Sequence, residues 1–463
     1  MVKVRAAMHE QVPETRQPTV VHRLQYALFR AVESLLGLFS LPTVVSAGNL
    51  LGDFAWMVFP KRRRLVTRNL RIATAANPPG DAEFRRMVRE TFRRAGGNML
   101  GGQRAATMPP AELRRHISFE GMEHIREPVL AGRGVVVVWA HMGNWESLAQ
   151  LPPELKIGAR GGPIYRPLEN PLLDRMTVER RTQHGAAIFS KHDGINGPAA
   201  LLREGGLVTV MSDQRAGGHG ALCPFFGRLS SCTPLASLLA RRTRSAVISL
   251  SISTRPGGNW SLKVRPVPDK AGTAEIMLGL EEAMHDSITD VFWFHDRWRI
   301  DKARPLCFFT RELPTEAARA ATVPTRLAVT LPPDRPEAVE ALVALLELRP
   351  DLRIDVLDPG GLSDLPDDPR IVRYPWDRSA PAEQTAGALE RCDRSHPAPL
   401  DFVLLLDGSV DLARAARRMG LRAIIGVDVR GKCWTRSFPV PENREGWRDI
   451  ASRLVIIGKN RKP

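Results

Sequence analysis

The residues best suited to chemistry in this chain are a histidine and a glutamate five positions apart, His141 and Glu146. They follow the apolar run 135–139, whose valines predict a buried strand of a parallel sheet. Functional side chains of such sheets gather where the strands end. Residues five positions apart on an ideal helix point in different directions, so His141 and Glu146 can meet only across a bend. Gly143 and Asn144 can supply that bend.

A histidine beside a carboxylate is typical of general base catalysis. A neutral imidazole accepts a proton at physiological pH, and a positioned base contributes about 10²- to 10⁴-fold to a rate. A carboxylate on the far ring nitrogen fixes the tautomer and stabilises the imidazolium. We therefore predict that His141 is the base and that Glu146 orients it. For an arbitrary pair of this spacing, the alternative is a core histidine capped by a nearby acid.

Further blocks of sequence accompany this pair in a fixed order. They span residues 60–64, 68–73, 141–146, 165–174, 213–214, 224–227 and 293–298. Through these blocks, residues 23–307 resemble the bacterial lysophospholipid acyltransferases of the lipid A late-acyltransferase type, which add secondary acyl chains to lipid A precursors. One departure is Asp296, which stands where that family usually has a basic residue.

The resemblance implies an acyltransferase that moves a fatty acyl chain from an acyl carrier thioester to a hydroxyl of a lipid A precursor or related glycolipid. The donor would be acyl carrier protein or acyl-CoA as co-substrate, and neither a metal nor another cofactor is expected. Two alternatives share the motifs. One is an acyl-CoA-dependent lysophospholipid or glycolipid acyltransferase, and the other is a catalytically inactive, lipid-binding envelope scaffold.

Arg166 is the first candidate for substrate binding, because it directly follows a strand predicted over 162–165. The donor or the acceptor of such a reaction carries phosphate, and a guanidinium binds phosphate with two hydrogen bonds. The alternative is an ion pair between Arg166 and Glu169 or Asp174.

Asp213 and Gln214 end a strand predicted over 207–212 and should face the same sheet edge as His141 and Arg166. There Asp213 could orient Arg166 or hold an acceptor hydroxyl. We assign Arg166, Asp213, Gln214 and Asn144 to substrate binding.

Several aromatic residues have a less specific pattern. Residues 225–227 are expected to shape the acyl tunnel through apolar surface and a tight turn, with core packing as the alternative. Trp293, His295 and Trp298 are expected to have packing or interface roles.

The predicted fold class is α/β, with an acyltransferase αβα sheet that has N-terminal membrane-associated helices and is followed by a smaller Rossmann-like domain. Further strands are predicted over 134–140 and 246–252, and helices over 82–99, 172–184, 197–204 and 233–243. The predicted domains are a polar tail (1–23), membrane-associated helices (24–64), an acyltransferase domain (65–310), a linker (311–324) and a C-terminal domain (325–463).

The segment 26–59 is strongly apolar but is interrupted by charged residues and by Pro42. We predict two amphipathic helices that lie on or dip into one leaflet, with simple covering of the core as the alternative. The basic run 61–64 follows the aromatic-containing run 54–59, a pattern typical of binding to anionic lipid at about 1 kcal/mol per cation. The expected location is the cytoplasmic face of the inner membrane, as a peripheral or monotopic protein.

The composition restricts the partners. A net charge of +16 indicates an anionic partner, and in the absence of a nucleic-acid-binding motif we expect acidic membrane lipid and acidic substrates but no nucleic acid. The five cysteines lie far apart without a CxxC pair, which argues against a zinc site or a disulfide framework and for a reducing compartment.

The C-terminal region alternates predicted strands (327–331, 353–357, 402–406, 423–427) with predicted helices (336–348, 410–419). Residues 400–409 and 420–426 resemble the N-terminal half of bacterial heptosyltransferases of glycosyltransferase family nine. Residues 330–334 replace that family's glycine-containing loop, and the half that would bind a nucleotide sugar is not expected in this chain. We therefore predict a degenerate accessory domain that docks an envelope-assembly partner, rather than an active glycosyltransferase.

Overall fold

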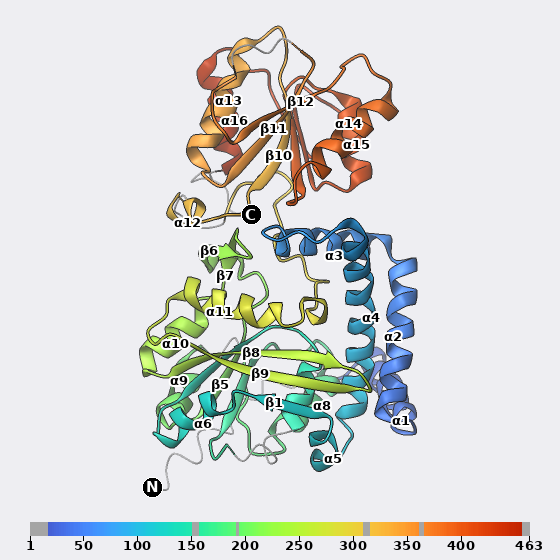
Figure 1. Ribbon diagram of the computed structural model, residues 1–463, viewed down its shortest axis with the longest axis vertical. Helices are drawn as coiled ribbons and strands as arrows, with labels where there is room; N and C mark the ends of the chain where they lie inside the picture. Colours follow the sequence, from blue (N-terminus) through green and yellow to red (C-terminus); the bar gives the residue numbers. More distant parts are fainter. Residues whose placement is uncertain (1–16, 151–156, 191–193, 309–314, 361–364, 456–463) are drawn as a thin grey trace.

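The structure, a computed structural model, describes residues 17–150, 157–190, 194–308, 315–360 and 365–455. These residues form two α/β lobes, which are stacked along the long axis of the molecule (Figure 1). Residues 1–16 of the predicted tail, 309–314 around the start of the predicted linker, and 456–463 lie outside the described residues.

The N-terminal lobe is built on a seven-stranded sheet with the order β1-β9-β8-β2-β5-β3-β4. Its strands are parallel except for the antiparallel pair β8–β9. The strands are β1 (Ile117–Glu120), β2 (Val135–Trp139), β3 (Gly161–Tyr165), β4 (Phe189–Ser190), β5 (Leu207–Met211), β8 (Ala246–Arg255) and β9 (Asn259–Val267). All five residues of β2 are buried, as the valine-rich run predicts for a central parallel strand.

Helices and short 3₁₀ turns surround this sheet. They are α5 (Pro110–Arg114), α6 (Glu123–Leu130), η1 (Trp145–Gln150), α8 (Pro171–Thr182), α9 (Asn196–Arg203), η2 (Gly217–His219), α10 (Leu235–Thr243), α11 (Thr273–His285) and η3 (Ile288–Asp290). The strands and helices predicted between residues 82 and 252 are confirmed within about three residues at each end, except that α4 (Asp81–Ala105) continues past the predicted end at residue 99. The hairpin β6 (Ala221–Phe225)–β7 (Arg228–Cys232) was not foreseen, and it extends toward the C-terminal lobe (Figure 1).

Four helices precede the sheet: α1 (Val20–Gly37), α2 (Leu41–Val58), α3 (Pro60–Ala73) and α4 (Asp81–Ala105). The backbones of α2 and α4 touch, because a Cβ on Gly48 would lie 2.4 Å from the carbonyl oxygen of Gly96 and one on Gly52 would lie 2.2 Å from that of Phe92. Helix α3 runs without a break through the predicted domain boundary at residue 64. Within the described parts of the chain, none of the helices has the length and apolarity needed to cross a membrane.

The C-terminal lobe has six parallel strands in the order β12-β11-β10-β13-β14-β15. They are β10 (Thr325–Thr330), β11 (Leu352–Asp358), β12 (Ile371–Pro375), β13 (Leu400–Leu405), β14 (Ala423–Val427) and β15 (Arg436–Phe438). Separate apolar clusters cover the two faces, one with α13 (Val339–Leu348) and α16 (Arg444–Val455) and the other with α14 (Ala382–Arg394) and α15 (Val410–Met419). The elements predicted for this region are confirmed. Two short helices, α12 (Thr315–Arg319) and η4 (Pro336–Ala338), precede α13, and α12 lies within the predicted linker.

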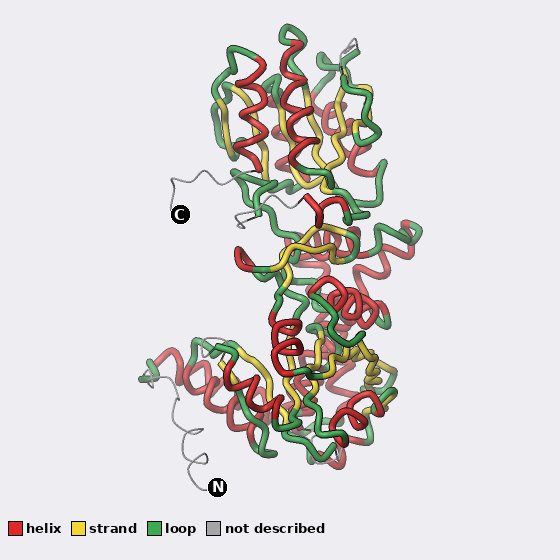
Figure 2. Tube along the Cα trace, turned by 90° about the vertical axis from the view of Figure 1, so that its left-hand side faces the viewer, coloured by secondary structure: helices red, strands yellow, loops and turns green. Residues whose placement is uncertain are grey.

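The two lobes meet through ion pairs. Helix α3 and the β6–β7 hairpin lie at the junction, as the perpendicular views in Figures 1 and 2 show. The carboxylate of Asp401, at the second position of β13, pairs with Arg68 of α3 at 2.5 Å and with Arg228 of β7. The side chain of Asp401 is fully buried. Its negative charge is therefore compensated inside the junction by two arginines of the N-terminal lobe.

Candidate active site

The two central strands of the N-terminal lobe bring His141 and Asp213 together. Strands β2 and β5 are parallel neighbours in which Trp139 is paired with Met211. His141 and Asp213 each lie two residues beyond this last pair, so they meet at the carboxyl edge of the sheet. The Nδ1 atom of His141 lies 2.9 and 3.1 Å from the two carboxylate oxygens of Asp213.

This hydrogen bond determines what the ring can do. With Nδ1–H donating to Asp213, Nε2 carries the free lone pair and can accept a proton. Burial of the ring opposes its protonation, but the hydrogen bond and charge of Asp213, together with the charge of Glu146, raise the pKa of His141 above its usual range. Asp213 is buried whereas the side chain of His141 is partly exposed, so solvent reaches the histidine but hardly its carboxylate partner.

The backbone around His141 is fixed by a segment that begins with the last residue of η3. The carbonyl of His141 accepts from the backbone N–H of Phe292 at 2.7 Å, and the N–H of Gly143 donates to the carbonyl of Asp290 at 3.0 Å. Gly143 has a φ of +55°, and a Cβ there would lie 2.5 Å from the carbonyl oxygen of Ile252. The bend after His141 therefore requires glycine.

The side chain of Asp290 anchors that segment to α4 and β8. It is fully buried and accepts hydrogen bonds from Arg94 at 2.7 Å and from Asn98 at 3.0 Å on α4. Backbone and hydroxyl groups of Thr254 on β8 also donate to it, at 2.7 and 2.5 Å. A buried carboxylate with this many donors holds one geometry, so the His141 loop rests on a rigid support.

Glu146 lies elsewhere than the sequence spacing suggests. The pattern assigns the far ring nitrogen of His141 to Glu146, whereas the structure places Asp213 there. The turn η1 directs Glu146 toward α8, where its two oxygens lie 2.9 and 3.0 Å from the guanidinium of Arg181. Glu146 is about half exposed and acts on His141 through its charge rather than through contact.

The predicted substrate residues follow the strands as expected but do not form the predicted pair. Arg166 directly follows β3, which neighbours β5, and its side chain is exposed. The carboxylate of Asp213 faces His141 instead of Arg166. No ion pair joins Arg166 to Glu169 or Asp174, and Asp174 accepts from the backbone N–H of Leu168 instead.

Gln214 and Asn144 differ in their surroundings. Gln214 is exposed next to Asp213. Asn144 is buried, and neither atom of its side-chain amide has a hydrogen-bonding partner among the described residues. An unpaired buried amide is unfavourable. The described residues leave both amide atoms of Asn144 without a hydrogen-bonding partner.

His295, for which the sequence predicts a packing or interface role, lies close to Asp213 and His141. Its Nε2 accepts from the backbone N–H of Arg215 at 3.4 Å, two residues beyond Asp213. Burial lowers the pKa of His295, and the charges of Asp213 and His141 both act on it. The aromatic residues around His295 in the sequence indicate packing. The sequence does not show that residues 291–295 lie against the end of β2, a proximity that only the fold reveals.

The aromatic turn 225–227 packs in the core. Phe226 and Gly227 have φ angles of 51° and 68° at the tip of the hairpin, and the ring of Phe226 contacts Trp293 and Trp298 edge to face. Among the described residues no group of three or more histidine, cysteine, aspartate or glutamate side chains is arranged to hold a metal ion.

Comparison with known proteins gives a consistent result. Residues 15–300 match the family model of bacterial lipid A biosynthesis acyltransferases. The chain is similar to a lipid A biosynthesis lauroyltransferase of Escherichia coli (strain K12), with 24% identity over 274 residues that cover 57% of this chain and 87% of the relative. A lipid A biosynthesis palmitoleoyltransferase of the same strain is 23% identical over 282 residues, 57% of this chain and 87% of its own length. A lipid A biosynthesis acyltransferase of Haemophilus influenzae is 24% identical over 268 residues, 54% and 83% of the two chains.

Proposed function

The chain belongs to the family of bacterial lipid A biosynthesis acyltransferases and is therefore an acyltransferase, and we propose that His141 and Asp213 are its catalytic pair. The observation that carries this proposal is the hydrogen bond between Nδ1 of His141 and Asp213 at the carboxyl edge of the central sheet. It leaves Nε2 as the base.

In the proposed reaction, Nε2 of His141 takes the proton of an acceptor hydroxyl as its oxygen attacks the thioester carbonyl carbon. The carbon–sulfur bond then breaks, and the departing sulfur takes the proton from the imidazolium. Asp213 stabilises the imidazolium between these two proton transfers. The nearby charge of Glu146 adds to that stabilisation, which gives Glu146 a supporting role. No step is assigned to a metal or another cofactor.

Substrate binding is assigned to the same edge of the sheet. Arg166 is exposed, so its guanidinium is accessible to a phosphate of the donor or acceptor. Gln214 is exposed beside the catalytic pair, and Asn144 has an unpaired amide that suits a substrate carbonyl or hydroxyl. The proposed acceptor is a lipid A precursor or a related glycolipid, and the proposed donor is an acyl carrier thioester, with acyl-CoA as the alternative.

We place the enzyme on the cytoplasmic face of the inner membrane, bound through α1 and α2. These helices and the turns that flank them expose many large apolar side chains. They are Val20, Val21, Leu24, Leu28, Val32, Leu35, Leu38, Phe39, Leu50, Leu51, Phe54, Met57, Val58 and Phe59. Exposed apolar side chains in this number suit the boundary between headgroups and acyl chains. Lys61, Arg62 and Arg64 at the start of α3 are exposed beside it and suit anionic headgroups, whereas Arg63 lies over the ring of Trp56.

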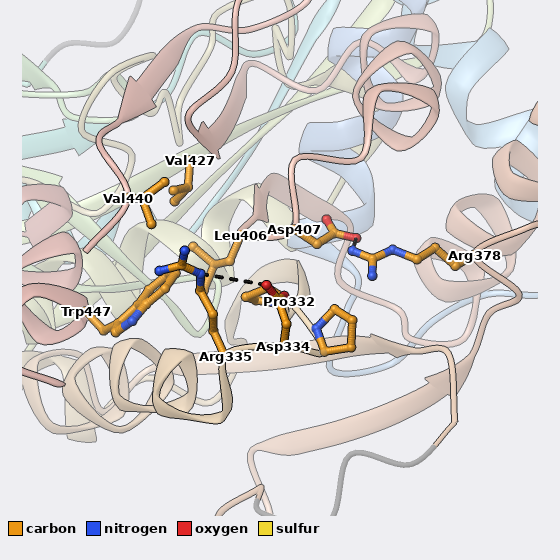
Figure 3. A pocket seen from close by; sticks show the side chains of 10 residues that line it. Pro332, Asp334, Arg335, Arg378, Leu406, Asp407, Val427, Val440 and Trp447 are labelled. Atoms are coloured by element: carbon orange, nitrogen blue, oxygen red, sulfur yellow. Dashed lines mark hydrogen bonds and ion pairs between the residues drawn. The ribbon is translucent and has the colours of Figure 1, made fainter. Parts of the chain in front are cut away.

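The C-terminal lobe is proposed to be a Rossmann-like accessory domain. Its strand order is that of doubly wound sheets, whose ligands bind at the carboxyl ends of the strands where the order reverses. A cleft of about 270 Å³ opens there (Figure 3). Its rim contains Asp334, Arg335 and Arg378, and Asp407 is held by Arg378 and by the hydroxyl of Thr330. No glycine-rich phosphate loop follows β10, which supports a role other than sugar transfer.

The test uses the purified full-length protein with a phosphorylated disaccharide lipid A precursor and either acylated acyl carrier protein or acyl-CoA. We expect transfer of one acyl chain from the carrier protein, and loss of transfer in His141→Ala without loss of the folded state. Transfer by His141→Ala at the wild-type rate would contradict the proposed mechanism. Faster transfer from acyl-CoA would select the alternative donor.

A further inference from the structure

We propose that Asp296 is a positioning residue through which the C-terminal lobe holds His141 in place. The inference rests on the proposed role of His141 as the base. It concerns the segment 288–298, which connects the catalytic edge of the N-terminal lobe to the junction between the lobes.

One end of this segment is bound to the catalytic pair. The hydrogen bonds of Asp290 and Phe292 fix the backbone on both sides of Met142, and Val291 forms an antiparallel bridge with Met142 itself. His295 then accepts from the backbone of Arg215, just beyond Asp213. A displacement of the segment would therefore reach His141 and the strand end that contains Asp213.

The other end is bound to the junction. Asn69 of α3 donates to the carbonyls of Trp293 at 2.9 Å and His295 at 2.7 Å. The carboxylate of Asp296 lies 3.6 Å from the guanidinium of Arg68 on α3 and forms a closer ion pair with Arg422 of the C-terminal lobe. Arg422 directly precedes β14. The C-terminal lobe thus contacts the segment only three residues beyond Trp293.

Asp296 depends on these two arginines. Both of its carboxylate oxygens are buried, and the carboxylate forms its ion pairs with Arg68 and Arg422. A buried carboxylate is unfavourable unless opposite charges compensate it. Arg68 is shared, because it also pairs with the buried Asp401 at 2.5 Å. Arg422 is therefore the partner that Asp296 does not share with Asp401.

The expected consequence is specific to catalysis. Without Arg422, Asp296 loses its closer ion pair and keeps the longer one with the shared Arg68, so its carboxylate moves toward solvent, and the segment moves with it. The positions of His141 and Asp213 change while the substrate-binding residue Arg166, on a different strand end, does not. Turnover should fall with little change in the KM of the donor.

The experiment is a double-mutant cycle in the full-length protein with Arg422→Gln, Asp296→Asn and the two together. We expect each single variant to lower kcat about 5-fold or more and the double variant to be no worse than the poorer single one, because the pair acts as a unit. Arg422→Lys, which retains the charge, should restore part of the turnover. Arg414→Gln is the matched control, since it removes an exposed arginine of the same lobe that pairs only with Asp411 among the described residues.

Wild-type turnover in Arg422→Gln would overturn the inference, and so would losses that simply add in the double variant. A variant that fails to fold is replaced in the cycle by the corresponding conservative one, Arg422→Lys or Asp296→Glu, and the same non-additivity is required. The proposed function fails separately, if the wild-type protein transfers no acyl chain or if His141→Ala remains active.

Discussion

At the scale of single residues, the proposed catalytic pair of His141 and Asp213 is formed by strand register rather than by sequence proximity. His141 and Asp213 are 72 positions apart, yet each lies at the same offset from the paired residues Trp139 and Met211. The sequence alone predicted that both residues follow buried strands and face one edge. It could not show that β2 and β5 are neighbours, so Glu146, which is close in sequence, was assigned as the partner of His141.

The pH dependence of turnover tests this pair. Asp213 raises the pKa of His141, so Asp213→Asn should lower that pKa and move the rising limb of the kcat profile to lower pH. Its maximum should fall about 10²-fold or more, by the scale of general base catalysis. Glu146→Gln is the matched control, since it removes a nearby charge without removing a hydrogen bond to the ring. A larger loss of kcat in Glu146→Gln than in Asp213→Asn would assign the orienting role to Glu146. An unchanged rising limb of the kcat profile in Asp213→Asn would do the same.

Arg166 can be tested in the same way. Arg166→Lys retains the charge but loses the planar, two-pronged contact with phosphate. We expect a several-fold increase in the KM of the phosphorylated substrate, measured in initial-rate assays. Arg175→Lys, an exposed arginine on α8, should leave that KM unchanged. Equal KM values in the two variants would remove Arg166 from the binding site.

At the scale of elements, about half of the helices and strands were predicted from their apolar patterns, whereas others, such as α11, α14, α16, β12 and β15, were not. The close packing of α2 against α4 was not predictable. In this packing Gly48 lies against Gly96, and Gly52 lies against the backbone of Phe92. Only the fold shows that these residues are close. Two strands at the far edge, β1 and β9, were missed as well, since β9 alternates buried and partly exposed residues and contains lysine and arginine.

The glycine contact predicts a difference between two identical substitutions. Gly52→Ala should lower the free energy of unfolding by about 1–3 kcal/mol, because its new methyl group meets the backbone of α4. Gly37→Ala should leave stability unchanged or increase it, because Gly37 lies in the neighbouring helix α1 and a Cβ there would have open space around it. Denaturant unfolding of both variants measures the difference. Equal stabilities would show that α2 and α4 are not in backbone contact.

The apolar surface of α1 and α2 predicts two kinds of lipid binding. Leu24→Ser with Leu28→Ser, at positions about two-thirds exposed, should weaken sedimentation with anionic vesicles at every salt concentration. Lys61→Gln with Arg62→Gln should weaken it chiefly at low salt, where the charges are unscreened. Leu130→Ser, an exposed leucine far from these helices in sequence, is the control. Full binding by both double variants would place the lipid-binding surface elsewhere.

At the scale of the whole molecule, the sequence predicted two α/β units and their order but not their junction. Arg68 and Asp401 are 333 positions apart, and Arg228 and Asp401 are 173 apart. Isolated charges of this kind look like ordinary surface residues until the lobes are placed together. The buried ion pairs indicate that the C-terminal lobe packs as a structural part of the protein. Its predicted docking of an envelope-assembly partner remains a prediction.

The most direct measurement of the central claim is mass spectrometry of envelope lipids from cells that contain the wild-type protein, lack it, or contain His141→Ala at the same level. We predict a lipid A-type species that is heavier by one fatty acyl chain in the wild-type cells alone. Equal amounts of the acylated species in all three, or its persistence in cells with His141→Ala, would contradict acyl transfer by His141.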